Sequence, residues 1–264
     1  MFLHSVGLKS DLIFNQFSGC VDVRDNYIKV CTATNPNYYW GNYLIFPHAP
    51  QIQDFEKWTS IFESEFSSFG GINHKAFAWD VSESLPANLE YFTERGCSLE
   101  TLSVMTAQKL NPPKTINTEI SIRKAESTRD WNDIINLQYQ VDESNSESAA
   151  SRLYLEKKYS EYRKMAEAGL GSWYCAFKGQ KLVGDLRLFN DKKTGRFQNV
   201  ETHPEFRNQG ICKTLVSYSA SDVLNKNENL TLVIQADVNE IAGKIYASLG
   251  FKETEKLQSL CLVS

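Results

Sequence analysis

The sequence predicts an α+β protein with mixed sheets, arranged as two tandem domains. Near the C-terminal end, a strand pattern passes through a turn at residues 207–210 into a helical pattern that begins at Ile211. The chain then continues with a strand, a helix that ends at a glycine, and a final strand. A similar order occurs before residue 108, and the turn-rich segment 111–114 separates the two copies. These three observations predict two domains with related folds.

The first half contains the earlier copy of this pattern. Residues 74–81 predict a strand, and a helix that ends at Gly96 precedes a further strand. Aligning Gly96 with Gly250 places Phe92 opposite Tyr246, which favours a diverged repeat, although helix, glycine and strand also form a common unit of unrelated folds. The first copy has no counterpart of the turn at 207–210 before its helix, because Gly70 and Gly71 lie in a Ser-rich loop. In addition, Phe92 lacks the hydroxyl of Tyr246. The first copy therefore lacks the features that distinguish the second.

An aromatic-rich run at residues 35–46 has two interpretations. It could form an exposed binding surface, or it could be a buried strand whose aromatic side chains pack in the core. We favour the buried strand, because aromatic side chains bury a large apolar area.

The second half supplies the remaining elements. Hydrophobic periodicity predicts, in chain order, a strand at 120–122, helices at 131–140 and 151–168, two hairpin strands at 171–177 and 181–189, and a turn at 191–195. Between the two helices, Asp142, Glu143 and Glu147 could attract a cationic group, or they could belong to a solvated acidic loop.

Composition excludes several classes of protein. The 264 residues are 42% hydrophobic and carry a net charge of −4, without a Lys/Arg stripe for nucleic-acid phosphates. Neither a secretory signal pattern nor an apolar run of the roughly 20 residues that span a membrane is present, which predicts a cytoplasmic protein. The six cysteines and four histidines form no pair with metal-ligand spacing, so we expect neither a metal site nor disulfides.

Two motifs near the C-terminal end carry a family resemblance. The first consists of Arg207, Gly210 and Cys212 with the spacing R-x-x-G-x-C. The second consists of Asn239, Ala242, Tyr246, Gly250 and Phe251. Together, and in this order, they resemble the GNAT superfamily of acyl-CoA-dependent acetyltransferases over about residues 120–264. The sequence departs from the family at Cys212, where the family has glycine or alanine.

The resemblance implies a GNAT-like mixed, mostly antiparallel sheet flanked by helices. It implies a degenerate N-terminal domain at 1–116 and a catalytic domain at 117–264. The implied reaction is the transfer of an acetyl group from acetyl-CoA to the amine of a small molecule or peptide, by direct attack in a ternary complex. The alternatives are a longer acyl donor, a non-amine acceptor, or a non-catalytic protein that binds or senses acyl-CoA.

The resemblance also assigns site residues. Tyr246 would lie near the sulfur of acetyl-CoA and act as the general acid. The backbone of strand residues 200–202 would pair with the pantetheine arm of the cofactor. The turn at 207–213, where the following helix begins, would hold the pyrophosphate of coenzyme A, because the first backbone N–H groups of a helix lack intrahelical partners. The predicted cofactor-binding residues are Val200, Thr202, Arg207, Asn208, Gln209, Gly210, Ile211, Cys212, Lys213 and Asn239.

The general base is predicted from the strand pattern. Glu201 lies on the face of the strand opposite to Val200 and could accept the amine proton, or it could simply be exposed to solvent. Asp185 and Arg187 share a face one strand earlier, where they could orient the acceptor or form an ion pair. His203 precedes a proline, which favours a role in the turn over a role in chemistry.

Overall fold

The chain folds into two compact units in the computed structural model, which describes residues 1–80, 89–141, 149–238 and 241–263. Unit 1 consists of Met1–Val104 together with Thr254–Ser264, and unit 2 consists of Met105–Glu253. Two long strands, β5 (Cys97–Ala107) and β11 (Lys252–Val263), therefore contribute residues to both units.

This division differs from the predicted boundary between residues 116 and 117. The C-terminal part of β11 completes the sheet of unit 1, because it pairs antiparallel with β4 (His74–Trp79) from Ser259 opposite Ala78 to Val263 opposite His74. The segment predicted as a linker instead belongs to unit 2, where the Asn111 N–H donates to the Leu249 carbonyl at 2.8 Å. Composition identified the turn-rich segment correctly but could not reveal this long-range strand pairing.

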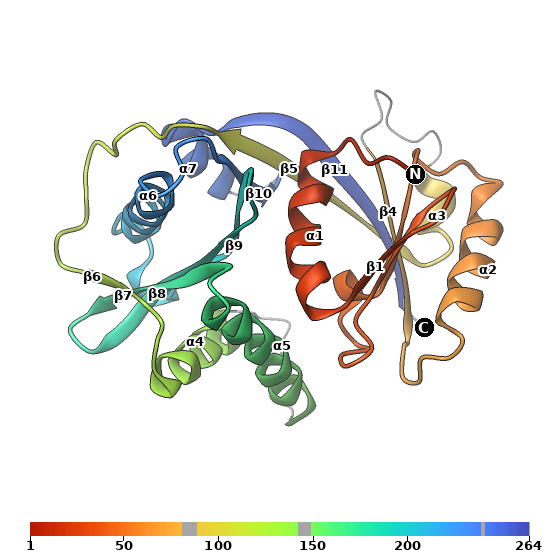
Figure 1. Cartoon of the computed structure of the whole chain (residues 1–264), viewed down its shortest axis with the longest axis horizontal. Helices are drawn as coiled ribbons and strands as arrows, with labels where there is room; N and C mark the ends of the chain where they lie inside the picture. Colours follow the sequence, from red (N-terminus) through yellow and green to blue (C-terminus); the bar gives the residue numbers. More distant parts are fainter. Residues whose placement is uncertain (81–88, 142–148, 239–240, 264) are drawn as a thin grey trace. The chain divides into compact units, whose positions relative to one another are not determined.

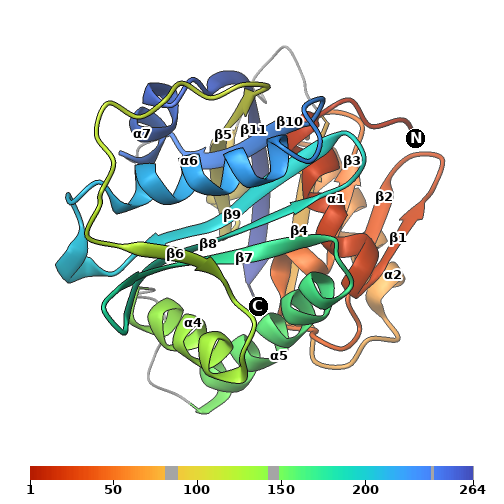
Figure 2. The ribbon, with the colours of Figure 1, turned by 60° about the vertical axis from the view of Figure 1, so that its left-hand side comes forward.

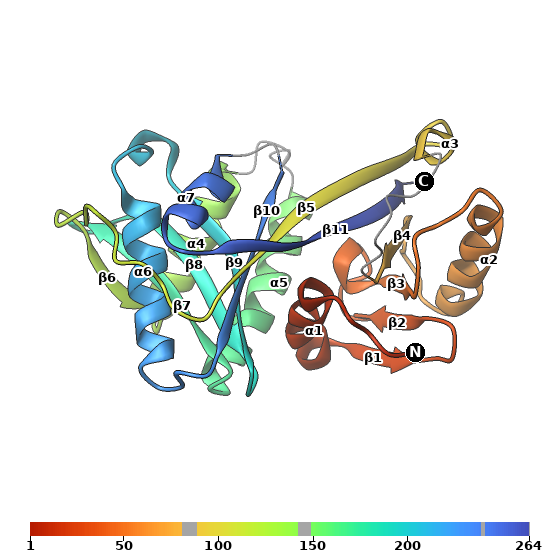
Figure 3. The same ribbon diagram turned by 90° about the horizontal axis from the view of Figure 1, so that it is seen from above.

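Unit 1 is an α+β unit with the strand order β1-β2-β3-β4-β11-β5. Figure 3 shows β11 alongside β5 in this unit, where the Thr254 hydroxyl donates to the Val104 carbonyl at 3.3 Å. Its further elements are α1 (Val6–Ser18), β1 (Cys20–Val23), β2 (Ile28–Cys31), the 3-10 helix η1 (Tyr39–Gly41), β3 (Tyr43–Phe46), α2 (Asp54–Phe66) and α3 (Leu89–Thr93).

An aromatic core holds α2 against the sheet of unit 1. All four residues of β3 are buried, so the interpretation as a buried strand holds for the end of the aromatic run. Earlier in the run, Tyr39 and Trp40 belong to η1 and are half-buried. The ring of Phe46 stacks on that of Trp58 in α2 with centroids 3.9 Å apart, and Phe62 packs edge-on to Phe77. Stacked and edge-on ring pairs add to the free energy gained by burial.

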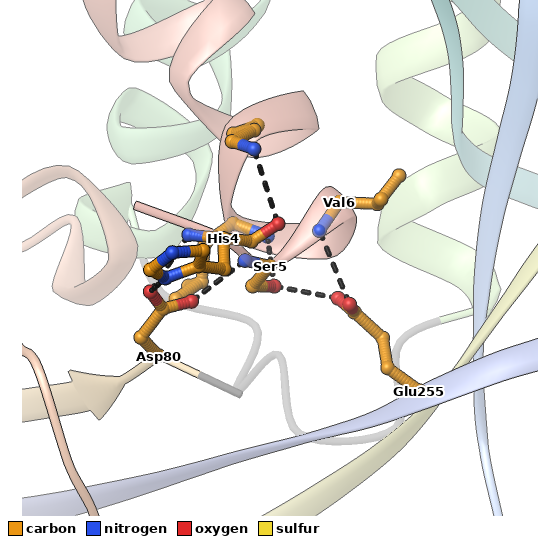
Figure 4. Close-up of polar contacts among 7 residues, drawn as sticks. His4, Ser5, Val6, Asp80 and Glu255 are labelled. Carbon is orange, nitrogen blue, oxygen red and sulfur yellow. Dashed lines mark hydrogen bonds and ion pairs between the residues drawn. The ribbon is translucent and has the colours of Figure 1, made fainter. Parts of the chain in front are cut away.

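Two carboxylates fix the N-terminus of α1 (Figure 4). Asp80 accepts hydrogen bonds from the backbone N–H groups of His4 and Ser5 at 2.7 and 2.6 Å. Glu255 accepts bonds from the Ser5 hydroxyl at 2.5 Å, from the Val6 N–H at 3.1 Å and from the Gly7 N–H at 2.7 Å. The start of the helix has unpaired N–H groups and partial positive charge, so carboxylates are stabilising there.

Removing the carboxylate of Glu255 should destabilise unit 1. We expect Glu255→Ala to lower its free energy of unfolding by about 2–4 kcal/mol, because hydrogen bonds to charged groups contribute roughly 1.5–3 kcal/mol each and are not fully additive. Denaturant unfolding measures the change, with Glu94→Ala at an exposed site of the same unit as the control. Equal stability of the two variants would show that Glu255 does not anchor α1.

Unit 2 is a second α+β unit, and its strand order is β5-β10-β9-β8-β7-β6, with residues 105–107 of β5 included. Helices α4 and α5 cover one face of the central strands, and α6 covers the other (Figures 1 and 2). The elements are β6 (Ser121–Lys124), α4 (Thr128–Val141), α5 (Ala149–Glu167), β7 (Gly171–Lys178), β8 (Lys181–Asn190), β9 (Thr194–Thr202), the 3-10 helix η2 (Pro204–Phe206), α6 (Ile211–Leu224), β10 (Thr231–Asp237) and α7 (Ala242–Ser248).

The observed elements confirm the predicted fold class. The sheet pairs are antiparallel except for β3 with β4 and β9 with β10 among those that have a determined register. Gly96 and Gly250, which follow α3 and α7, have φ values of 86° and 100°, the left-handed conformation expected at the end of a helix. Within the described residues, no helix combines the length and the apolar character that crossing a membrane requires.

Candidate functional site

The most distinctive feature of unit 2 is the divergence of its two central parallel strands. The register joins β9 to β10 from Thr194 opposite Thr231 to Arg196 opposite Val233. Strand β9 then continues to Thr202 and β10 continues to Asp237, without a further paired position in the described part of the chain. The two strands therefore separate, and the end of β9 presents a backbone edge towards β10. Such an edge can pair with an extended ligand as an added strand would.

A bulge in β9 accompanies this separation. The register with β8 shifts between Arg187 opposite Gln198 and Asp185 opposite Glu201, and Asn199 has a left-handed φ of 49°. The Asn199 side-chain amide donates to Oε1 of Gln138 in α4 at 2.8 Å, which fixes the bulge to the helix. Because a bulge bends its strand and increases the local twist, it turns the last residues of β9 out of the line of β10.

The strand leads into a turn built for close approach of a ligand. Gly210 precedes α6 with φ 75°, and a Cβ placed on it would meet no atom within 4 Å. The first N–H group bonded within the helix is that of Thr214, which donates to the Gly210 carbonyl at 3.1 Å. The preceding N–H groups, those of residues 211–213, are thus available at the positive end of the helix dipole. This arrangement can bind an anion through backbone groups.

Most of the predicted cofactor-binding residues lie along this strand and turn. Residues 207–210 are exposed, and the Nε atom of Arg207 donates to the Thr202 carbonyl at 3.4 Å. The side chain of Ile211 is 1% exposed and packs in the core, so only its backbone can contact a ligand. Cys212 and Lys213 are half-buried in the first helical turn. The predicted residue Asn239 lies outside the described residues, as do Asp142, Glu143 and Glu147.

Cys212 is not set up as a nucleophile. Burial, together with the nearby charge of Glu201, raises the pKa of its thiol to about 12. Because the thiolate is the reactive form, a thiol with a raised pKa is a poor nucleophile at neutral pH.

The predicted acid and base occupy different positions around the strand. Tyr246 in α7 is 4% exposed, and its ring packs edge-on to Phe251 in the hydrophobic cluster that includes Ile211. Val200 packs against the same cluster, on the α6 side of the sheet. Glu201 follows Val200 in the strand and therefore faces the α4 and α5 side, where it is half-buried.

An aromatic cage around Arg187 was not predicted from the sequence. Its guanidinium lies 3.7 Å from the centroid of the Tyr162 ring and 5.9 Å from that of Trp173, and Arg187 is 1% exposed. The alternative of a hydrogen-bonded ion pair with Asp185 is not realised, because neither Asp185 oxygen has a hydrogen-bond partner in the described part of the chain. Tyr159 and Tyr162 on α5 were the available signal, since they lie three residues apart and share a helix face.

His203 has the role in the turn that its sequence position favours. Its Nδ1 atom accepts a bond from the Glu205 N–H at 3.3 Å at the start of η2, and burial lowers the pKa of the imidazole.

Comparison with known proteins agrees with this geometry. The model of the acetyltransferase (GNAT) domain family matches residues 169–253, which include the bulged strand and the glycine turn. The chain has a GNAT acetyltransferase fold. A search of curated proteins gives no match.

Solved structures share this GNAT fold over 83–97% of this chain. A functionally unknown conserved protein from Staphylococcus epidermidis has a TM-score of 0.76 and 17% identity, over 94% of this chain and 95% of that protein. A GCN5-related N-acetyltransferase from Kribbella flavida has a TM-score of 0.63 and 12% identity, with 97% and 96% covered. A tandem GNAT protein from the clavulanic acid biosynthesis pathway has a TM-score of 0.56 and 10% identity, with 83% and 73% covered. At these identities the likeness concerns the fold.

Proposed function

We propose that unit 2 binds acetyl-CoA and transfers the acetyl group to an amine. The observation that carries this proposal is the divergence of β9 from β10 at the point where β9 leads into the glycine turn of α6. An extended arm with a pyrophosphate at one end matches both parts of this arrangement. The open space at the Cβ position of Gly210 leaves room for the phosphates next to the backbone.

The individual contacts follow from the elements. The N–H groups of residues 211–213 would hold the pyrophosphate, and the exposed side chains of Arg207, Asn208 and Gln209 flank it. The backbone of Val200 and Thr202 would pair with the amides of the pantetheine arm. Asn239 would complete the contacts, as the family motif implies.

Acetyl transfer requires deprotonation of the amine, stabilisation of the tetrahedral oxyanion and protonation of the leaving thiolate. An amine must lose its proton before its nitrogen attacks the thioester carbon, and Glu201 would accept that proton directly or through a water. The tetrahedral oxyanion needs hydrogen-bond donors, and backbone N–H groups near the bulge of β9 could supply them. When the carbon–sulfur bond breaks, Tyr246 would donate its phenolic proton to the thiolate that leaves. The nitrogen loses its second proton as the amide forms, and this proton would restore the phenol of Tyr246 through solvent.

A covalent enzyme intermediate is not part of this proposal. Cys175 is fully buried, and burial raises the pKa of its thiol well above the ordinary value, as burial also does for Cys212. We therefore propose direct attack within a ternary complex of protein, acetyl-CoA and amine.

Thiol release from acetyl-CoA in the presence of an amine panel tests the proposal. We expect release that depends on both the protein and an amine, and formation of the acetylated amine by mass spectrometry. If the protein binds acetyl-CoA but no amine accelerates release, a non-catalytic acyl-CoA-binding role replaces the enzymatic one. Faster release with longer acyl-CoA donors would instead correct the choice of acyl group.

A further inference from the structure

A row of side chains crosses the sheet of unit 2 beneath α5. Asp185 on β8 lies directly opposite Cys175 on β7 and directly opposite Glu201 on β9. Residues that are directly opposite in antiparallel strands point to the same face. The two carboxyl groups therefore lie on the same face of the sheet, on neighbouring strands.

Burial distinguishes the two carboxyl groups. Asp185 is 0% exposed and neither of its oxygens has a hydrogen-bond partner within the described residues, whereas Glu201 is half-buried. A buried carboxylate without hydrogen bonds is costly, and the group takes up a proton instead. Two like charges on neighbouring strands in a low dielectric add to that cost, because both cannot be ionised cheaply.

The other groups around Asp185 do not supply a compensating hydrogen bond. Burial comes first and the charge of Glu201 second in raising the pKa of Asp185 well above its ordinary value. The indole of Trp173 offsets part of this rise, although its Nε1 is outside hydrogen-bonding geometry. The titratable or charged groups around the pair, within the described residues, are Cys175 on β7, Arg187 on β8, Tyr159 and Tyr162 on α5, and Cys212 on α6, which is close to Glu201.

We propose that only one of the two carboxyl groups is protonated near neutral pH, and that Asp185 carries the proton while Glu201 is ionised. Asp185 is then a positioning residue that acts through Glu201. It keeps the pair at one negative charge and places that charge on the half-buried carboxylate. The protonation states do not depend on the proposed function. Their consequence for catalysis does rest on it, because there Glu201 accepts the proton of the amine.

Infrared spectroscopy tests the protonation state without any assay of activity. A protonated buried carboxyl gives a C=O stretching band that a carboxylate lacks. We expect such a band at about pH 7 that disappears in Asp185→Asn and persists in Glu228→Gln, an exposed acid of the same unit. In Glu201→Gln, where the neighbouring charge is gone, the Asp185 band should titrate away at lower pH than in the wild type.

The pH dependence of stability provides a second readout. A carboxyl group with a raised folded-state pKa holds a proton that the unfolded chain releases. Its stabilising contribution is complete below the ordinary pKa and is lost as the pH rises towards the folded-state pKa. We therefore expect the unfolding constant of the wild type, relative to that of Asp185→Asn, to rise about tenfold per pH unit between about pH 5 and 7. Amide hydrogen exchange of β8 reports it.

Two results would overturn the proposal. Absence of the Asp185 band at neutral pH, with parallel stability curves, would mean that Asp185 is ionised. An identical titration of the band in wild type and Glu201→Gln would mean that the two carboxyl groups are not coupled. Neither result depends on acetyl transfer, so a failure of the proposed function would show separately, as a lack of acetyl-CoA binding or of thiol release.

Discussion

Tyr246→Phe is expected to lower turnover by about 10²- to 10⁴-fold, the usual contribution of a general acid, while the dissociation constant for acetyl-CoA stays nearly unchanged. The ring of Tyr246 is buried and packs against Phe251, and phenylalanine keeps that ring. Only the hydroxyl is lost, so the variant should fold normally. Steady-state kinetics with saturating acetyl-CoA, combined with titration calorimetry, separates the two effects.

A second tyrosine provides the matched control. Tyr218 on α6 is 49% exposed, and Tyr218→Phe removes the same hydroxyl elsewhere in unit 2. We expect this variant to keep wild-type turnover. Turnover of Tyr246→Phe equal to that of Tyr218→Phe would remove Tyr246 from the role of acid and leave its hydroxyl a packing feature of the core.

Gly210→Trp is expected to abolish measurable binding of coenzyme A. The side chain would enter the open space where the phosphates are proposed to lie. Loss of two hydrogen bonds to a charged group, at roughly 1.5–3 kcal/mol each, corresponds to at least about a 100-fold weaker affinity. Titration calorimetry with coenzyme A and acetyl-CoA measures the change.

The control separates backbone strain from the blocked site. Gly169 has the same φ of 75° as Gly210, and a Cβ there would also meet no atom within 4 Å. Gly169→Trp therefore carries the same cost of a left-handed side-chain-bearing residue, roughly 1–2 kcal/mol, away from the glycine turn. Equal affinity losses in the two variants would attribute the effect to strain and would argue against a phosphate site at Gly210.

Local patterns were sufficient to predict the turn and its flanking elements. The apolar alternation up to Val200, the glycine at Gly210 and the helical spacing from Ile211 are properties of neighbouring residues, and the observed β9 and α6 follow them. The hairpin of β7 and β8 was predicted for the same reason. The bulge at Asn199 was not, because it depends on the register with β8 and on the contact with Gln138 of α4.

Long-range pairing accounts for most of what the sequence did not predict. The compact units differ from the predicted domain ranges because β11 pairs with β4, more than a hundred residues earlier in the chain. The burial of Asp185 depends on its neighbours in two strands and a helix, and no pattern within β8 distinguishes a buried carboxyl from an exposed one. Likewise, Tyr162 contacts Arg187 only because α5 packs on that face of the sheet.

Amide hydrogen exchange of the full chain, with and without acetyl-CoA, tests the central claim most directly. Binding along the diverging edge should slow exchange of the N–H groups in residues 200–202 of β9 and residues 211–213 of α6, and leave residues 1–80 unchanged. No protection of either segment at saturating acetyl-CoA would contradict the proposed site. Protection confined to unit 1 would place the ligand elsewhere and contradict it equally.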